Sequence, residues 1–160
     1  MKMFILFFLL IKISFLPVSA SENTELLEME KRIIEVYQNN VSSVVNVANI
    51  KVANNYFYGE VEVPQGAGTG FVWDKQGHIV TNFHVVQGGD SFLVTFHNDK
   101  KQYKAKVIGV APKSDIAVLK LMNPPTSLKP IKVGSSQGLK VGQLSLAIGN
   151  PFGFDHSISR

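Results

Sequence analysis

Two residues, His84 and Asp115, have the types and surroundings that acid–base chemistry requires. His84 lies between the apolar pairs Ile79-Val80 and Val85-Val86, and Asp115 directly precedes the apolar run 116–119. A charged side chain buried beside such a run needs a partner. A carboxylate that accepts the Nδ1–H of a histidine fixes its tautomer and stabilises the imidazolium, as in a Ser-His-Asp site. Together the two residues indicate such a pair. The alternative is a core histidine with a backbone partner and an aspartate that caps a turn.

The other three histidines have less specific surroundings. His78 follows a turn glycine and His97 precedes Asn98-Asp99, so we expect both to be exposed. His156 follows Asp155, and no group that would converge on it is evident. The sequence has no H-E-x-x-H motif, no histidine pair at helical spacing and no cysteine. We therefore predict neither a metal site nor a cofactor.

A second nucleophile pattern occurs in the five residues 134–138. Their sequence, Gly-Ser-Ser-Gln-Gly, matches the G-x-S-x-G elbow of α/β-hydrolases. That elbow needs a helix after it, but residues 139–142 are a poor helix start. The acid and histidine that follow, Asp155 and His156, are adjacent, and adjacent side chains of a strand point to opposite faces. We interpret the pattern as a polar turn.

The composition excludes several classes of protein. The 160 residues are 45% hydrophobic and 18% charged, which excludes a disordered chain, and the lack of cysteine excludes a disulfide scaffold. The net charge of +4 includes Lys2 and Lys12, and no acidic residue lies within the first 20. Residues 21–160 therefore have a net charge of only +2, which does not favour nucleic-acid binding. We interpret the densest basic cluster, 100–106, as a solvated strand face or turn.

The first 20 residues have the layout of a secretory signal peptide. Met1-Lys2 is a basic start, the apolar runs 3–11 and 13–16 follow, and Val18-Ser19-Ala20 has small residues at the cleavage positions. The alternative is an uncleaved membrane anchor. A membrane span needs about 20 apolar residues, whereas here the run is shorter and Lys12 interrupts it. We predict export, with cleavage after Ala20.

Beyond the signal peptide, the apolar period changes from that of a helix to that of strands. Residues 24–39 carry an apolar stripe at helical spacing, which predicts one amphipathic helix within 21–40. Short strands separated by turn signals then predict an all-β sandwich or barrel. The predicted strands are 44–52, 70–73, 78–86 (interrupted at 81–84), 92–96, 103–110, 116–121 and 144–148, with loops at 54–66 and 123–130.

Four segments occur in an order that identifies a family. They are GTGFV at 68–72, IVTNFHVV at 79–86, KSDIAVLK at 113–120 and AIGNPFG at 147–153. Together they strongly resemble the HtrA (Do/Deg) family of trypsin-like serine proteases, over roughly residues 40–160. The resemblance implies that His84 is the general base and Asp115 its orienting acid, with Thr81-Asn82 shaping the turn that presents His84. On this basis we predict that the two side chains lie within hydrogen-bonding distance, although 30 residues separate them.

The same resemblance implies the rest of the architecture. We expect residues 41–122 to form the first six-stranded β-barrel of a trypsin-like domain, and 123–160 to form a linker and the start of the second barrel. Family members are double-barrel proteases, usually followed by PDZ domains and assembled as trimers. They degrade or process misfolded proteins in the periplasm or cell envelope. These properties imply unfolded protein substrates and no nucleic-acid partner.

The sequence departs from the family in one respect. The family's nucleophile lies in a Gly-Asn-Ser-Gly-Gly-Pro segment of the second barrel, and these 160 residues contain no such segment. We therefore expect a truncated N-terminal half of a protease. We expect it to be inactive alone, because the members of a catalytic triad act as a unit. The alternative is a non-catalytic exported β-domain that binds or regulates a partner protease.

Overall fold

The computed structural model of the chain describes residues 27–99, 101–150 and 156–160. The predicted signal peptide, 1–20, and the first residues of the predicted helix lie outside these ranges. Within the described residues, no helix has the length and hydropathy needed to cross a membrane.

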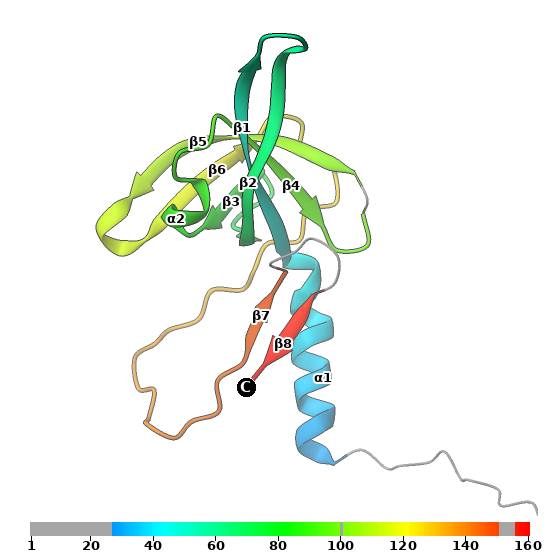
Figure 1. The fold of residues 1–160 in the computed structure, drawn as a ribbon. Helices are drawn as coiled ribbons and strands as arrows, with labels where there is room; N and C mark the ends of the chain where they lie inside the picture. Colours follow the sequence, from blue (N-terminus) through cyan, green and yellow to red (C-terminus); the bar gives the residue numbers. More distant parts are fainter. Residues whose placement is uncertain (1–26, 100, 151–155) are drawn as a thin grey trace, which may run out of the picture.

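One helix precedes the strands, as the sequence predicts. The helix α1, Glu28–Asn40, continues into a 3₁₀ turn at Val41–Ser43. Its first turn is held by the carboxylate of Glu30, which accepts the backbone N–H of Leu27 at 2.8 Å. No residue of α1 is buried, because the helix extends away from the barrel, beside the C-terminal strands (Figure 1).

Six antiparallel strands form a closed barrel, which confirms the predicted all-β, trypsin-like fold class. The strands are β1 (Val44–Asn55), β2 (Gly59–Val72), β3 (His78–Thr81), β4 (Ser91–Phe96), β5 (Gln102–Ala111) and β6 (Ile116–Leu121), and they pair in the order β1-β2-β3-β6-β5-β4. Alternate residues of each strand fill the interior, among them the fully buried Val47, Ile79, Val94 and Leu119. A separate two-stranded sheet pairs β7 (Ala147–Gly149) with β8 (Ser157–Ser159).

The predicted loop at 54–66 is wrong. β1 and β2 pair along their whole length, from Val44 with Phe71 to Asn55 with Gly59, and only residues 56–58 form the turn. The end of this hairpin projects from the barrel and carries three exposed aromatic side chains at 56–58 (Figure 1). Pro64 is tolerated because β2 pairs with β3 only at 70–72, so the other edge of β2 has no ladder for Pro64 to interrupt.

Two other strand predictions need correction. The predicted strand 78–86 ends at Thr81, and the one-turn helix α2, Phe83–Val86, follows it, so His84 lies on a helix. The predicted strand 144–148 is present only as β7, Ala147–Gly149. The polar turn predicted at 134–138 is confirmed, because these residues are exposed and no helix follows them.

Candidate active site

The short helix α2 carries His84 and is fastened to the barrel at two places. The side-chain amide of Asn49 donates to the carbonyls of Val85 and Gln87, at 2.9 and 3.1 Å. At the second place, Val85 lies against Gly68 of β2. A Cβ atom added at position 68 would lie only 2.4 Å from Val85 Cγ2. A glycine at position 68 is therefore what allows α2 to lie this close to the sheet.

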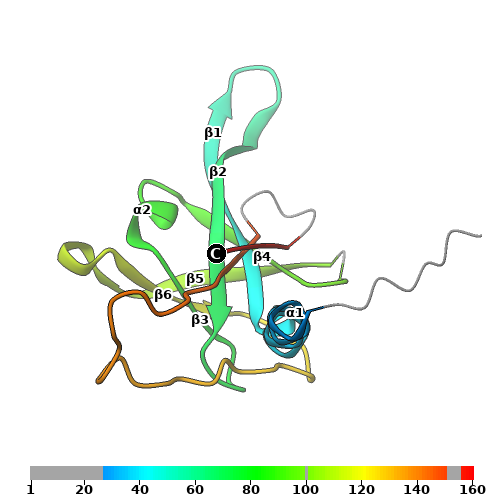
Figure 2. The same ribbon diagram turned by 90° about the horizontal axis from the view of Figure 1, so that it is seen from below.

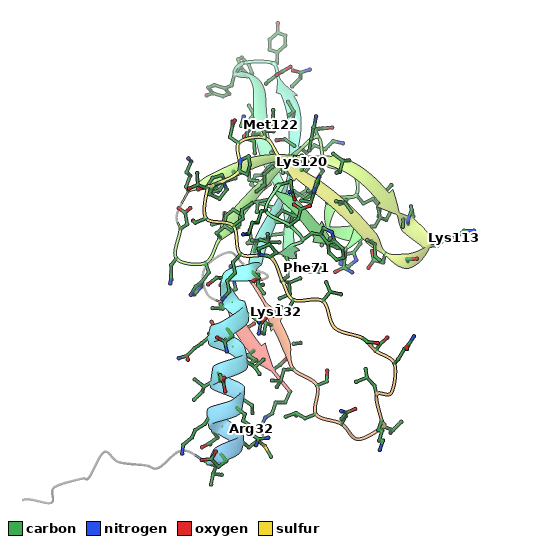
Figure 3. The ribbon with its side chains drawn as sticks, turned by 180° about the vertical axis from the view of Figure 1, so that it is seen from behind. Arg32, Phe71, Lys113, Lys120, Met122 and Lys132 are labelled. Atoms are coloured by element: carbon green, nitrogen blue, oxygen red, sulfur yellow. The ribbon has the colours of Figure 1, made fainter. Side chains whose placement is uncertain are left out.

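Asp115 belongs to the connection between β5 and β6. A 3₁₀ turn, Pro112–Ser114, ends at Asp115, whose φ of 51° and ψ of 44° are left-handed. Aspartate is one of the few residues other than glycine that adopt this conformation readily. In Figure 3, Lys113 marks the tip of this connection, well away from Arg32 on α1. Figures 1 and 2 both place α2 on the same side of the barrel as the β5–β6 connection.

The structure brings His84 and Asp115 together in a two-point contact. Asp115 Oδ2 lies 2.7 Å from His84 Nδ1, and Asp115 Oδ1 accepts the backbone N–H of His84 at 3.0 Å. The predicted distance is thus confirmed. Because an ionised carboxylate only accepts, the proton of this contact belongs to Nδ1. In the neutral ring, Nε2 then holds the lone pair that a general base needs.

Asn82 is a third member of this group that sequence reasoning did not place in contact with Asp115. Its side-chain amide donates to Asp115 Oδ2 at 3.1 Å and to the backbone carbonyl of Asp115 at 3.2 Å. The group is open to solvent, since the His84 and Asp115 side chains are 68% and 44% exposed. The backbone N–H of His84 is the main cause that lowers the pKa of Asp115 below its ordinary value of 3.8. Burial opposes this effect, the side chains of His84 and Asn82 add to it, and the net shift is downward.

A second histidine–carboxylate pair lies at the other end of β3. His78 Nδ1 is 2.5 Å from Asp74 Oδ2, while Asp74 Oδ1 accepts the backbone N–H groups of Gln76 and His78. The expected exposure of His78 is wrong, because the His78 and Asp74 side chains are only 29% and 28% exposed. Burial raises the pKa of Asp74, but the hydrogen bonds from His78 outweigh it and the net shift is downward.

The last two histidines meet each other, contrary to the expectation for His156. Their Nδ1 atoms are 3.1 Å apart, and His156 Nε2 lies 2.9 Å from the carbonyl oxygen of Val44. His97 is half-buried rather than exposed. Nearby, the buried Asn150 accepts a hydrogen bond from Asn46 of β1 at 2.9 Å. These contacts join β7 and β8 to the barrel, and no local sequence signal predicts them because they link residues 59 to 112 positions apart.

The described residues place no metal-binding group at His84, and the best-formed pocket lies elsewhere. Within the described residues, no three histidine or carboxylate side chains are close enough together to hold a metal ion. A pocket of about 650 Å³ lies between α1 and the segment 129–132, and none of its lining residues belongs to the group around His84. His84 therefore lies on an exposed surface of the barrel.

Comparisons with known proteins agree with this fold. The trypsin-like peptidase domain family matches residues 68–160, which is more than half of the chain. Protease Do-like 1, chloroplastic, of Arabidopsis thaliana is 49% identical over 127 residues, which is 79% of this chain and 29% of the relative. The probable periplasmic serine endoprotease DegP-like protein of Pseudomonas fulva is 46% identical over 95 residues, which is 59% of this chain and 19% of the relative.

A solved structure gives the same result. The crystal structure of Deg5 superposes with a TM-score of 0.68 at 35% identity, covering 84% of this chain and 63% of that one. The chain therefore belongs to the trypsin-like peptidases and, within them, to the HtrA (Do/Deg) family. It spans less than a third of the length of the two relatives named above.

Proposed function

We propose that this chain supplies the general base and the orienting acid of an HtrA-type serine endopeptidase. His84 Nε2 takes the proton of a serine hydroxyl as the hydroxyl oxygen attacks the peptide carbonyl, and later gives that proton to the leaving amine. Asp115 keeps Nδ1 protonated and stabilises the imidazolium. The two-point contact between Asp115 and His84 carries this proposal, because it fixes both the tautomer and the ring orientation.

In this proposal, the nucleophile comes from outside the 160 residues. They contain no Gly-Asn-Ser-Gly-Gly-Pro segment, and the relatives are more than three times as long as the part that the chain matches. We assign residues 41–122 to the first barrel of the protease domain, and 123–160 to the linker and the start of the second. We assign the oxyanion hole and the specificity pocket to the part of the longer relatives that these 160 residues do not match, so we expect the 160 residues alone to be inactive.

We further propose that the substrates are unfolded or misfolded exported proteins, and that the whole protein works as a trimer-based oligomer in the periplasm or cell envelope. The predicted signal peptide at 1–20 and the periplasmic name of the Pseudomonas fulva relative support this location. The family membership supports protein as the substrate class.

A chimera tests the catalytic proposal. Residues 21–160 would replace the matching part of the 49% identical chloroplast relative, which supplies the remaining sequence. We expect this chimera to degrade unfolded casein and to react with a serine-directed fluorophosphonate. His84→Ala should lower kcat by about 10⁶-fold, as removal of a triad histidine does in another serine protease.

Two outcomes of this experiment would contradict the proposal. One is a folded chimera that neither degrades casein nor reacts with the probe, which would favour a non-catalytic domain that binds or regulates a partner protease. The other is an active chimera whose kcat does not depend on His84. The 160-residue chain alone is the matched control, and it should not react with the probe.

A further inference from the structure

Asn82 occupies the N-cap position of α2 but does not cap it. Asparagine is favoured at an N-cap because its side-chain oxygen accepts a backbone N–H two or three residues later. Here Asn82 has the extended backbone of an N-cap, with φ of −76° and ψ of 147°, yet its side chain makes no capping hydrogen bond. The N–H of His84, which such a side chain would accept, donates to Asp115 Oδ1 instead.

The side-chain nitrogen of Asn82 is directed toward Asp115. It donates both to the carboxylate oxygen Oδ2 and to the backbone carbonyl of the same residue. Asn82 thus holds the left-handed backbone of Asp115 and its side chain at the same time. Because Oδ2 is also the atom that meets His84 Nδ1, the amide acts on the oxygen that orients the ring.

Because the Asp115 carboxylate is exposed to solvent, it needs a hydrogen-bonding partner that fixes its position. A carboxylate that is 44% exposed is not fixed by packing, and water competes for each of its hydrogen bonds. Within the described residues, the hydrogen bonds to the Asp115 carboxylate come from His84 and Asn82 alone. Since His84 is the group being oriented, Asn82 is the side chain that can set the carboxylate from outside the pair.

We propose that Asn82 is a positioning residue whose amide locks Asp115 against His84, rather than a helix cap. The catalytic meaning of this role rests on the proposed function, whereas the positioning itself does not. The proposal separates two properties of asparagine, the N–H donors that reach Asp115 and the oxygen that could cap α2.

Two substitutions in the 160-residue chain test this separation. Asn82→Ser keeps a good N-cap residue but cannot reach Asp115 with two donors. Asn82→Asp keeps the shape and the capping oxygen, removes both donors and adds a like charge. Nitrogen NMR of the imidazole reports the His84 tautomer, and carbon NMR reports the titration of the Asp115 carboxyl. Asn54→Ser, on the projecting hairpin, is the matched control.

We expect Asn82→Ser to lower the Nδ1–H to Nε2–H ratio of His84 by about 5-fold, the effect of losing one ordinary hydrogen bond. The Asp115 titration should move to higher pH, further in Asn82→Asp than in Asn82→Ser, and Asn54→Ser should change neither. An Asn82→Ser variant with the wild-type tautomer ratio and Asp115 titration would overturn the proposal.

A measurement on the unmodified chain keeps the proposal testable if the variants do not fold. The side-chain amide protons of Asn82 should shift with pH at the same midpoint as the Asp115 carboxyl, and amide protons that do not follow that midpoint would refute the contact.

If the chimera is inactive while Asn82→Ser still changes the His84 tautomer, the proposed function fails and the positioning role stands. If the chimera is active and Asn82→Ser changes neither the tautomer nor kcat, only the positioning role is refuted.

Discussion

Two histidine–carboxylate pairs in this chain share one pattern of contacts. They differ in how far apart the partners lie in the sequence, in the elements that carry them and in their exposure to solvent. In both, the carboxylate places Oδ2 against Nδ1 of the ring and accepts the histidine backbone N–H with Oδ1. In the pair of Asp74 and His78, the partners are four residues apart within one turn. In the pair of His84 and Asp115, they are 31 residues apart, on α2 and on the β5–β6 connection.

The comparison shows that the contact pattern alone does not define a catalytic pair. The local pair folds with its own turn, where Asp74 accepts two backbone N–H groups and Gly77 takes a φ of 89°. The distant pair exists only when the barrel has closed, because β3 must pair with β6 to bring its two parts together. It is also the more exposed pair, so its ring is open to a substrate. We therefore propose a structural role for the first pair and a catalytic role for the second.

The largest expected difference between the pairs is in activity. In the chimera, Asp115→Asn should lower kcat by about 10⁴-fold, because an amide no longer holds the tautomer that the base requires. Asp74→Asn makes the same change in the local pair and should leave kcat within about 2-fold, since it acts only through stability. Steady-state kinetics on a peptide substrate measures both. Equal losses in the two variants would remove the distinction between the pairs.

The second expected effect is on the position of α2. Gly68→Ala would place a Cβ atom 2.4 Å from Val85, and overpacking of this kind destabilises by about 1–3 kcal/mol. Gly66→Ala, where no atom lies within 4 Å of the added Cβ, is the control. We expect urea unfolding to show the loss only at position 68, and NMR to show a disturbed His84 but an unchanged His78. A Gly68→Ala chain as stable as Gly66→Ala would show that α2 does not depend on this contact.

A somewhat smaller effect is expected when the local pair is broken. Asp74→Ala removes the acceptor of two turn N–H groups and of the His78 ring, so the free energy of unfolding should fall by about 1–2 kcal/mol. Asp74→Asn keeps an oxygen for the backbone groups and should lose less. Chemical denaturation of the two variants measures the difference. If Asp115→Ala destabilised the chain more than Asp74→Ala, the structural role would belong to the other pair.

The smallest expected effect is the response to acid. The pKa values of Asp74 and Asp115 are both lowered from 3.8 in the folded chain. A carboxyl with a lowered folded pKa stabilises the protein above its unfolded pKa, and this contribution disappears as the pH falls through the folded value. The stability advantage of the wild type over Asp74→Asn/Asp115→Asn should therefore shrink as the pH falls below 3.8. An advantage that does not depend on pH in this range would contradict the downward shifts.

The sequence predicted the barrel because the alternation of apolar residues survives in most of its strands. It predicted the contact between His84 and Asp115 from two residue types and a family resemblance. It did not predict the long β1–β2 hairpin, because Pro64 and the glycines near it are typical of loops. The alternation of glutamate and valine at 60–63 was the available signal. The sequence shows the proline at position 64, but it does not show that β2 is paired along only one edge at this point.

The helix α2 could not be predicted from its own residues. Phe83-His84-Val85-Val86 contains two adjacent valines and favours a strand by local propensity. What makes it a helical turn lies elsewhere, in Asp115, which accepts the N–H of His84, and in Asn49, which holds the other end. The contact of Asn82 with Asp115 was not predicted because the two residues are 33 positions apart, and Asn82 was expected only to shape the turn that presents His84.

The claim that Asp115 holds His84 as a base is tested most directly by the tautomer of its ring. Nitrogen NMR of the 160-residue chain at neutral or higher pH should show His84 as the Nδ1–H tautomer in the wild type. Asp115→Asn should remove this preference, while Asp74→Asn should change only His78. A His84 ring that favours Nε2–H, or that is unaffected by Asp115→Asn, would contradict the account.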